Sequence, residues 1–155
     1  MILANVADVS EIYQHVLLVR LATELYALPA DRLREIVRWR TPVAVPGAPA
    51  MLPGIIAQRG TVLPVVDLRL LFGLAAAAPG RTARYVVGSY TGVDMAMLVD
   101  EVLDLVDIER ASLEPPPATL DLQQVRLLRA VTRYHDRPLA LIDPGAVLAM
   151  LSAKE

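Results

Sequence analysis

The apolar residues of this chain come in short blocks rich in Val, Ile and Leu, and Gly or Pro separates the blocks at intervals of roughly ten residues. Blocks of this length and spacing are typical of the strands of an all-β protein. The pattern predicts about ten strands, with two or three short helices beside them. So many strands exceed what one small closed barrel can hold, and the sequence therefore predicts two small barrels packed together.

Most of the predicted strands form consecutive pairs with short connections, which is the arrangement of β-hairpins. Gly60 and the Thr91-Gly92 pair stand at two of the connections, where a positive φ costs Gly little. Residues 31–39 fit both a helical face and a strand, and we interpret them as a helical turn that leads into a strand. The expected strands are 16–21 with 25–29, 55–59 with 61–66, 84–90 with 94–99, the single strand 102–108, and 126–133 with 138–142.

Residues 41–53 contain four Pro and one Gly, a density that no regular element tolerates. We expect an ordered connection there, with one short helical turn at 49–52. Asp67 precedes a short predicted helix at 68–72, and Asp143 precedes a predicted C-terminal helix. Both carboxylates can cap the helix that follows them, because the first N–H groups of a helix have no partner inside it.

The composition excludes several classes of protein. Against 17 Asp and Glu the chain has 15 Lys and Arg, and a net charge of −2 gives no basic field for nucleic acid. A chain without Cys has neither disulfides nor thiolate metal sites. The longest apolar run, 70–79, is far shorter than the roughly 20 residues that span a bilayer. Residues 1–10 lack the features of a secretory signal, so we expect a cytoplasmic protein without membrane insertion.

No residue pattern indicates catalysis. His15 and His135 have no second His or paired carboxylate at ligand spacing, and we interpret both as solvated side chains. The acidic stretch at 100–107 lacks the loop pattern of a calcium site, so we interpret it as a solvated face. There is also no phosphate-binding Gly loop and no Ser in a nucleophile elbow. We therefore expect no catalytic group, metal or cofactor, and a small enzyme with an unrecognised site is the alternative from another class.

One segment carries a specific signature. Residues 53–69 read Pro-Gly-Ile-Ile-Ala-Gln-Arg-Gly-Thr-Val-Leu-Pro-Val-Val-Asp-Leu-Arg. This segment strongly resembles the signature of the CheW family of chemotaxis coupling proteins, Gly-Val-x-Asn-Leu-Arg-Gly-x-x-Leu/Val-Pro-Val-x-Asp-Leu-Arg. The chain departs from it at Ala57-Gln58, where the family has Asn-Leu. Ala57 cannot bond the local backbone as Asn does, so we expect the hairpin to survive and the effect to fall on partner affinity.

Five further segments agree with the family in order and spacing, and the resemblance covers about residues 16–151. It implies that 1–155 is a single CheW-like domain made of two β-barrel subdomains, with 1–15 as an N-terminal extension. The implied fold is all-β, with two small five-stranded β-barrels packed around a shared apolar interface, short connecting helices and a C-terminal helix. The five segments are 25–29, 34–37, 46–54, 98–102 and 141–143.

The resemblance implies a non-catalytic adaptor. Its partners would be the cytoplasmic tip of a chemoreceptor and the regulatory domain of a chemotaxis histidine kinase. The adaptor would be a monomer alone, recruited in the cytoplasm to signalling arrays of membrane-bound receptors. The kinase needs further domains that 155 residues cannot hold, and the chain runs from Met1 to a helix with a short charged tail, so we expect the free-standing adaptor. A CheW-like scaffold of a surface-motility or other chemosensory-like pathway is the alternative.

The same resemblance suggests which residues bind a partner. Glu35 and Arg59 match a Glu and an Arg of the family, and we predict that they pair across strands beside a groove for a helical receptor tip. Two glycines at turns could let a partner helix approach closely, and two apolar residues either line the groove or pack in the core. The predicted partner-binding residues are Leu33, Glu35, Ile36, Gly54, Arg59 and Gly60.

Overall fold

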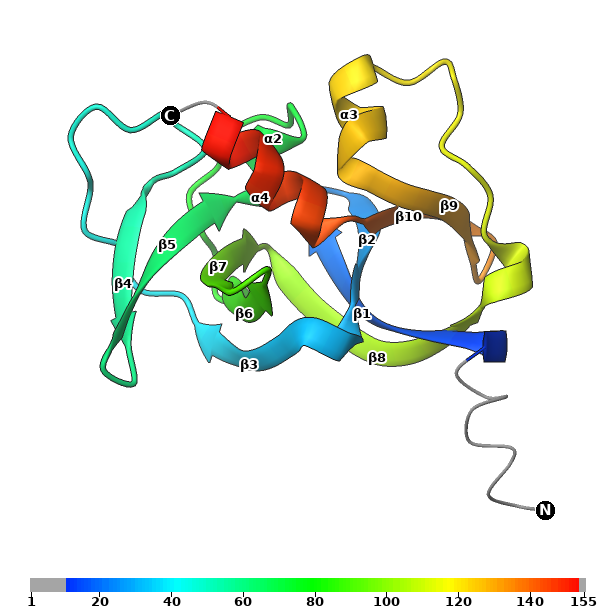
Figure 1. Cartoon of the computed structure of the whole chain (residues 1–155), viewed down its shortest axis with the longest axis horizontal. Coiled ribbons are helices and arrows are strands. Elements are labelled where there is room, and N and C mark those ends of the chain that lie inside the picture. The colour runs from blue at the N-terminus through cyan, green and yellow to red at the C-terminus, as the bar shows by residue number, and fades with distance from the viewer. Residues whose placement is uncertain (1–10, 154–155) are drawn as a thin grey trace. The chain divides into compact units, whose positions relative to one another are not determined.

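Ten strands form two five-stranded sheets in the computed structural model, which describes residues 11–153 (Figure 1). The chain divides into two compact units. Among the described residues, the first unit contains 11–18, 25–31 and 103–153, and the second contains 19–24 and 32–102. The predicted all-β class with two five-stranded units is therefore confirmed, whereas the N-terminal extension at 1–15 lies mostly outside the described residues.

The first sheet takes its strands from both ends of the described chain. Its order is β8-β1-β2-β10-β9, and β2 runs parallel to β10, with Leu25 opposite Leu139. The strands are β1 (Tyr13–Leu21), β2 (Glu24–Pro29), β8 (Glu101–Glu109), β9 (Leu128–Tyr134) and β10 (Arg137–Ile142).

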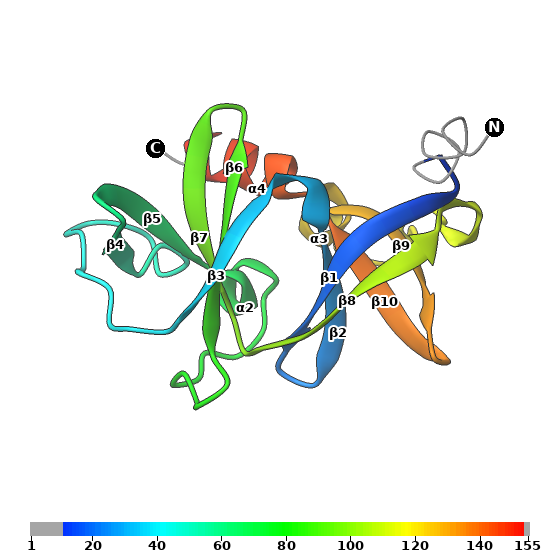
Figure 2. The same cartoon turned by 90° about the horizontal axis from the view of Figure 1, so that it is seen from below.

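The second sheet is continuous in sequence. Its order is β3-β6-β7-β5-β4, so β3 and β4 are the two edge strands (Figure 2). β5 runs parallel to β7, with Val65 opposite Ala96. The strands are β3 (Leu33–Arg38), β4 (Gly54–Gln58), β5 (Thr61–Asp67), β6 (Arg84–Tyr90) and β7 (Val93–Val99).

The two sheets have the same strand topology, but the chain starts at a different strand of that topology in each. In the second sheet the chain makes an edge strand (β3), then the hairpin β4–β5, then the hairpin β6–β7. In the first sheet the corresponding edge strand is β8 and the corresponding hairpins are β9–β10 and β1–β2, so the last hairpin of the topology comes first in the chain.

The helices that follow β5 and β10 have the predicted caps. Asp67 accepts a hydrogen bond from the backbone N–H of Leu70 at 3.4 Å and begins α2 (Leu68–Leu71). Asp143 accepts one from the N–H of Ala146 at 3.2 Å and begins α4 (Pro144–Ala153). Each carboxylate thus satisfies one of the N–H groups that a helix start leaves without a partner.

Each unit has a core of its own, built from the inward-facing residues of its strands. Alternation along a strand sends every second side chain to this core, which explains the Val, Ile and Leu blocks of the sequence. The first core contains Val16, Leu18, Leu25, Ala27, Ile108, Ala130, Leu139 and Leu141. The second contains Ile56, Leu63, Val65, Tyr85, Val87 and Ala96.

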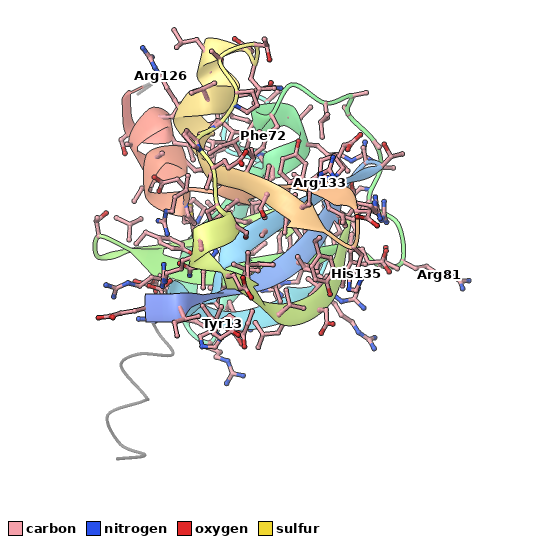
Figure 3. The ribbon with its side chains drawn as sticks, turned by 90° about the vertical axis from the view of Figure 1, so that its right-hand side faces the viewer. Tyr13, Phe72, Arg81, Arg126, Arg133 and His135 are labelled. Atoms are coloured by element: carbon pink, nitrogen blue, oxygen red, sulfur yellow. The ribbon has the colours of Figure 1, made fainter. Side chains whose placement is uncertain are left out.

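One local prediction was wrong, and another is confirmed as a single turn. Residues 126 and 127 belong to a helix, α3 (Leu122–Leu127), and β9 begins only after it. Asp121 caps this helix by accepting from the N–H of Gln123 at 3.3 Å, and Figure 3 shows Arg126 pointing outwards from it. The helical turn expected at 49–52 is a single hydrogen-bonded turn, in which the Leu52 N–H donates to the carbonyl of Pro49.

Other turns agree with the sequence. A 3-10 turn, η1 (Ala30–Arg32), precedes β3 as predicted, and a second, η2 (Arg110–Ser112), follows β8. The expected connection at 41–53 is ordered, because Val43 and Ile55 exchange two backbone hydrogen bonds of 2.9 Å. These bonds bring the backbone of Val43 directly against Gly54.

Tyr85 ties the end of β3 to the second core. Its ring is fully buried, and its hydroxyl donates a 2.7 Å hydrogen bond to the backbone carbonyl of Arg40. Burial raises the pKa of Tyr85 to about 12, because the phenolate would lose its hydration. Arg40, just past β3, is held in place by this bond.

We predict that Gly54→Ala destabilises the fold. A Cβ at this position would overlap the carbonyl oxygen of Val43, and Gly54 has a φ of +156° that side chains rarely adopt. We expect a loss of about 1–3 kcal/mol in the free energy of unfolding, measured by urea titration. The control is Gly80→Ala, since a Cβ at Gly80 meets nothing within 4 Å. Equal stability of the two variants would contradict this prediction.

The buried phenol of Tyr85 predicts a loss of stability at high pH. The folded chain keeps the proton to a pKa of about 12, whereas an unfolded Tyr loses it near pH 10, at its usual pKa of about 10. The stabilisation is therefore complete below about pH 10 and falls between about pH 10 and 12, by up to about 1.4 kcal/mol per pH unit. Over that range, the free energy of unfolding of the wild type, measured with urea, should fall relative to that of Tyr85→Phe. A difference between the two proteins that stays constant from pH 9 to 12 would show the prediction to be wrong.

Candidate partner-binding site

The predicted ion pair between Glu35 and Arg59 is present. Nε of Arg59 lies 3.1 Å from Oε2 of Glu35, and the pair joins β3 to the β4–β5 turn. Glu35 is only 22% exposed, whereas Arg59 is 79% exposed. An exposed pair of this kind contributes about 0–1 kcal/mol to stability. The ion pair therefore contributes little to the stability of the fold, and its main effect is to orient the guanidinium of Arg59 at the surface.

β3 places Glu35 toward the second unit's core side. Along this strand the partly buried residues are Leu33, Glu35 and Val37, and they alternate with exposed ones. A β-bulge shifts the register against β6 between Leu33 and Glu35, just before the carboxylate. Bulges redirect side chains locally, and this one lies where β3 faces the site.

The β4–β5 turn places Arg59. Gln58 pairs with Thr61, so Arg59 and Gly60 form a two-residue turn, with φ values of +50° and +78°. Positive φ at both positions is the type I′ geometry that suits a hairpin, and it favours Asn-Gly. Arg is a poor residue for the first position, since a side chain at positive φ is strained. The turn therefore carries Arg59 at a conformational cost.

Gln58 and Arg40 extend the pair into a chain of hydrogen bonds. Nε2 of Gln58 donates to Oε1 of Glu35 at 3.2 Å, and Oε1 of Gln58 accepts from Nη2 of Arg40 at 3.1 Å. Nη2 of Arg40 also donates to the backbone carbonyl of Ala57. These contacts connect β3 and β4, the two edges of the second sheet, which do not pair with each other in the described chain.

A surface pocket of about 300 Å³ opens beside this network. Its floor includes Leu63 and Val87, both buried, and its rim includes a second ion pair in which Nη1 of Arg34 lies 3.4 Å from Oδ2 of Asp94. In both pairs the carboxylate is the less exposed partner and the guanidinium the more exposed one. The lining residues are Arg34, Glu35, Gln58, Arg59, Thr61, Leu63, Val87 and Asp94.

The structure does not bring all six predicted residues together. Leu33, Glu35, Arg59 and Gly60 lie on β3 or at the adjoining turn, with Leu33 on the same face of β3 as Glu35. Ile36 is 45% exposed and lies on the opposite face of that strand, so it neither lines the pocket nor packs in the core.

The two predicted glycines differ. Gly54 is buried, and the group that approaches it closely is the backbone of Val43 and not a partner. A Cβ at Gly60 would meet nothing within 4 Å, so this glycine serves the positive φ of the turn and leaves the space beside it open.

The sequence does not single out Gln58, Arg40 or the Arg34–Asp94 pair as site residues. For Gln58 one signal exists, because the alternation of the strand puts it on the face of buried Ile56. The other contacts join residues that are far apart in sequence, and no local pattern reveals such pairs.

Asp100 corrects the prediction of a solvated acidic face. Its Oδ2 accepts from Nε of Arg69 at 2.7 Å and from the N–H of Ala22 at 2.6 Å, and only 17% of its side chain is exposed. Burial raises the pKa of nearby Asp67, and the charge of Asp100 adds to that rise. By contrast Asp104 is exposed, and Asp107 pairs with exposed His15.

The remaining observations concern metal binding, membrane-spanning helices and the position of His135. Among residues 11–153, no three His, Asp or Glu side chains are grouped so that they could hold a metal ion. Within the same residues, no helix has both the length and the apolar character needed to cross a bilayer. His135 lies in the β9–β10 turn with a φ of +48° (Figure 3).

Comparison with known proteins gives consistent matches. The chain is 28% identical to the chemotaxis protein CheW of Bacillus subtilis over 123 residues, which are 79% of each chain. It is 29% identical to the probable chemotaxis protein CheW of Rhizobium etli, over 84% of each chain. It is also 31% identical to protein FrzA of Myxococcus xanthus, over 67% of this chain and 65% of that one.

A solved structure has the same fold. The scaffolding protein TtCheW from Thermoanaerobacter tengcongensis superposes with a TM-score of 0.78 at 27% identity, covering 85% of this chain and 90% of that one. The family profile described as the CheW-like domain matches residues 15–152. This chain therefore belongs to the CheW-like domain family, whose members are non-catalytic adaptors of chemotaxis signalling.

Proposed function

We propose that this adaptor couples a chemoreceptor to a chemotaxis histidine kinase, and that the pocket beside Glu35 and Arg59 is part of a partner-binding surface. The partners would be the cytoplasmic tip of the receptor and the regulatory domain of the kinase. The protein would act in the cytoplasm, at arrays of membrane-bound receptors, and would be a monomer until it joins them. Family membership supports the coupling role, and the site rests on the geometry described above.

The observation that carries the site is the exposed guanidinium of Arg59, which Glu35 holds beside the pocket. Positive φ by itself does not distinguish this residue, because Ala22 and Thr91 share it at other turns. The side chain is 79% exposed and makes one ion pair, through Nε, with Glu35. Arg is enriched among the residues that dominate binding at protein interfaces. Exposure and orientation by a neighbouring carboxylate together suit a recognition residue.

The predicted binding residues take different roles in this proposal. Leu33, Glu35, Arg59 and Gly60 form the contact surface, since they lie on β3 and at the adjoining turn. Gly54 acts indirectly, because it allows residues 41–53 to pack against β4. Ile36 would belong to a second contact on the outer face of β3.

Coupling requires more than holding two proteins together. The receptor's signalling states must change the free energy with which the adaptor and kinase interact, and by linkage the kinase then affects receptor binding to the same extent. A helical receptor tip would present apolar side chains at helical spacing, which suits a pocket with an apolar floor and polar walls.

The direct test measures binding by the full-length chain. Titration calorimetry with a chemoreceptor cytoplasmic fragment, and separately with a chemotaxis histidine kinase, should show saturable binding to both. Binding to neither would reject the coupling role. Receptor fragments from a non-chemotaxis system of the same cell should be included, since the identity to protein FrzA favours a chemosensory-like pathway as the second candidate.

We predict that Arg59→Asn separates folding from binding. Asn-Gly is the preferred type I′ sequence, so the variant should unfold at the same or slightly higher urea concentration than the wild type. Without the guanidinium, affinity for the partner should fall by about tenfold or more, which is about 1.4 kcal/mol.

The matched control is Thr91→Asn. Thr91 and Gly92 form the other two-residue turn of the same sheet, with φ values of +49° and +79°. This variant makes the same Asn-Gly turn at a residue that does not line the pocket, and it should bind partners as the wild type does. Unchanged affinity of Arg59→Asn would remove Arg59 from the binding surface and leave the coupling role intact.

A further inference from the structure

The side chain of Gln58 lies between the carboxylate of Glu35 and the guanidinium of Arg40. The residue shares the face of β4 with buried Ile56, and its side chain reaches across to β3. Its amide nitrogen donates to Oε1 of Glu35 at 3.2 Å, while its amide oxygen accepts from Nη2 of Arg40 at 3.1 Å. Only a side chain with both a donor and an acceptor can make these two contacts.

The contacts divide the carboxylate of Glu35 between two donors. Nε2 of Gln58 donates to Oε1, and Nε of Arg59 donates to Oε2 at 3.1 Å. A carboxylate held by one oxygen can rotate about its last bond, and the second contact removes that freedom. The position of the Arg59 guanidinium therefore depends on Gln58 as well as on Glu35.

Arg40 fixes which way the Gln58 amide faces. A guanidinium only donates, so the amide oxygen must face Arg40 and the amide nitrogen must face Glu35. The backbone of Arg40 is in turn anchored by the hydroxyl of buried Tyr85. A series of contacts thus links buried Tyr85 to Arg40, Arg40 to Gln58, Gln58 to Glu35, and Glu35 to exposed Arg59.

We propose that Gln58 is a positioning residue, which orients the Glu35–Arg59 pair for the partner and so sets specificity at this pocket. This inference rests on the proposed function for its binding consequence. Where the family signature has Leu, this chain presents an amide to the pocket and connects its two edge strands by polar contacts. Leu could neither donate to Glu35 nor accept from Arg40, and Arg59 would keep only one of the two constraints.

The first test does not involve a partner. In Gln58→Leu, the Nε–H of Arg59 should exchange with water several-fold faster than in the wild type by NMR, because its acceptor is no longer held. The control Ala57→Leu adds the same side chain one residue away, on the exposed face of β4, and should leave this exchange unchanged. Equal exchange in the wild type and Gln58→Leu would overturn the proposal.

The second test asks whether Gln58 acts through Arg59. Gln58→Leu should weaken binding of the receptor fragment or kinase by about fivefold, the ratio expected for one hydrogen bond of ordinary net strength. In an Arg59→Asn background the same substitution should change affinity little, because the group that it positions is gone. A full fivefold loss in that background would mean direct contact with the partner and would overturn the positioning role.

The two tests separate the two hypotheses. If the wild type binds neither partner, the coupling role fails, and the Arg59 exchange rates still decide whether Gln58 positions the pair. Should Gln58→Leu unfold, Gln58→Met provides a side chain of similar length that cannot donate to Glu35 and accepts only weakly, and the same exchange rates are expected. Circular dichroism and urea unfolding of each variant establish that it is folded before either measurement.

Discussion

The carboxylate of Glu35 is the point at which side chains from the two edge strands of the second sheet meet. An edge strand has a row of backbone groups without partners in the sheet, and on β4 Ile55 bonds Val43 instead. Here side chains provide the connection between β3 and β4, through Arg40, Gln58 and Arg59 as well as Glu35. The pocket, the exposed guanidinium and the setting of the β4–β5 turn all depend on this bridge.

A bridge made of side chains differs from a backbone ladder. Its members can be exchanged by mutation without altering either strand, and its strength responds to charge and to salt in a way that a ladder does not. A bridge of this type can therefore differ between proteins that share the fold. The amide of Gln58 is such a difference, because it stands where the family signature has Leu.

Features that depend on local chemistry were predictable from the sequence. Gly60 marked a turn with positive φ, and Asp67 and Asp143 marked helix starts, because one residue and its nearest neighbours decide each of these. The Glu35–Arg59 pair was predicted from a resemblance and not from physics. The strand expected at 126–133 began too early, since Val-Arg-Leu-Leu suits either a strand or a helix, although Asp121 offered the signal of a cap.

Features that depend on distant contacts were not predictable. Asp100 looked like one of several solvated acids, and only the fold brings Arg69 and the N–H of Ala22 to it. Ile36 could not be assigned to a face without the position of β6, and the close neighbour of Gly54 proved to be another part of the same chain.

The shared strand topology of the two sheets has a consequence for synthesis. All strands of the second sheet lie within residues 33–99, so its longest pairing, Leu33 with Gly88, closes a shorter loop than Leu25 with Leu139 and can form while the chain is still emerging from the ribosome. The first sheet cannot be completed in this way, since β2 must wait for β10 and Leu25 pairs with Leu139. Its hairpin β1–β2 is synthesised first, but β2 obtains its second neighbour, β10, only at the end of synthesis. The unit that carries Glu35 and Arg59 is thus able to fold before the unit that contains the described start of the chain.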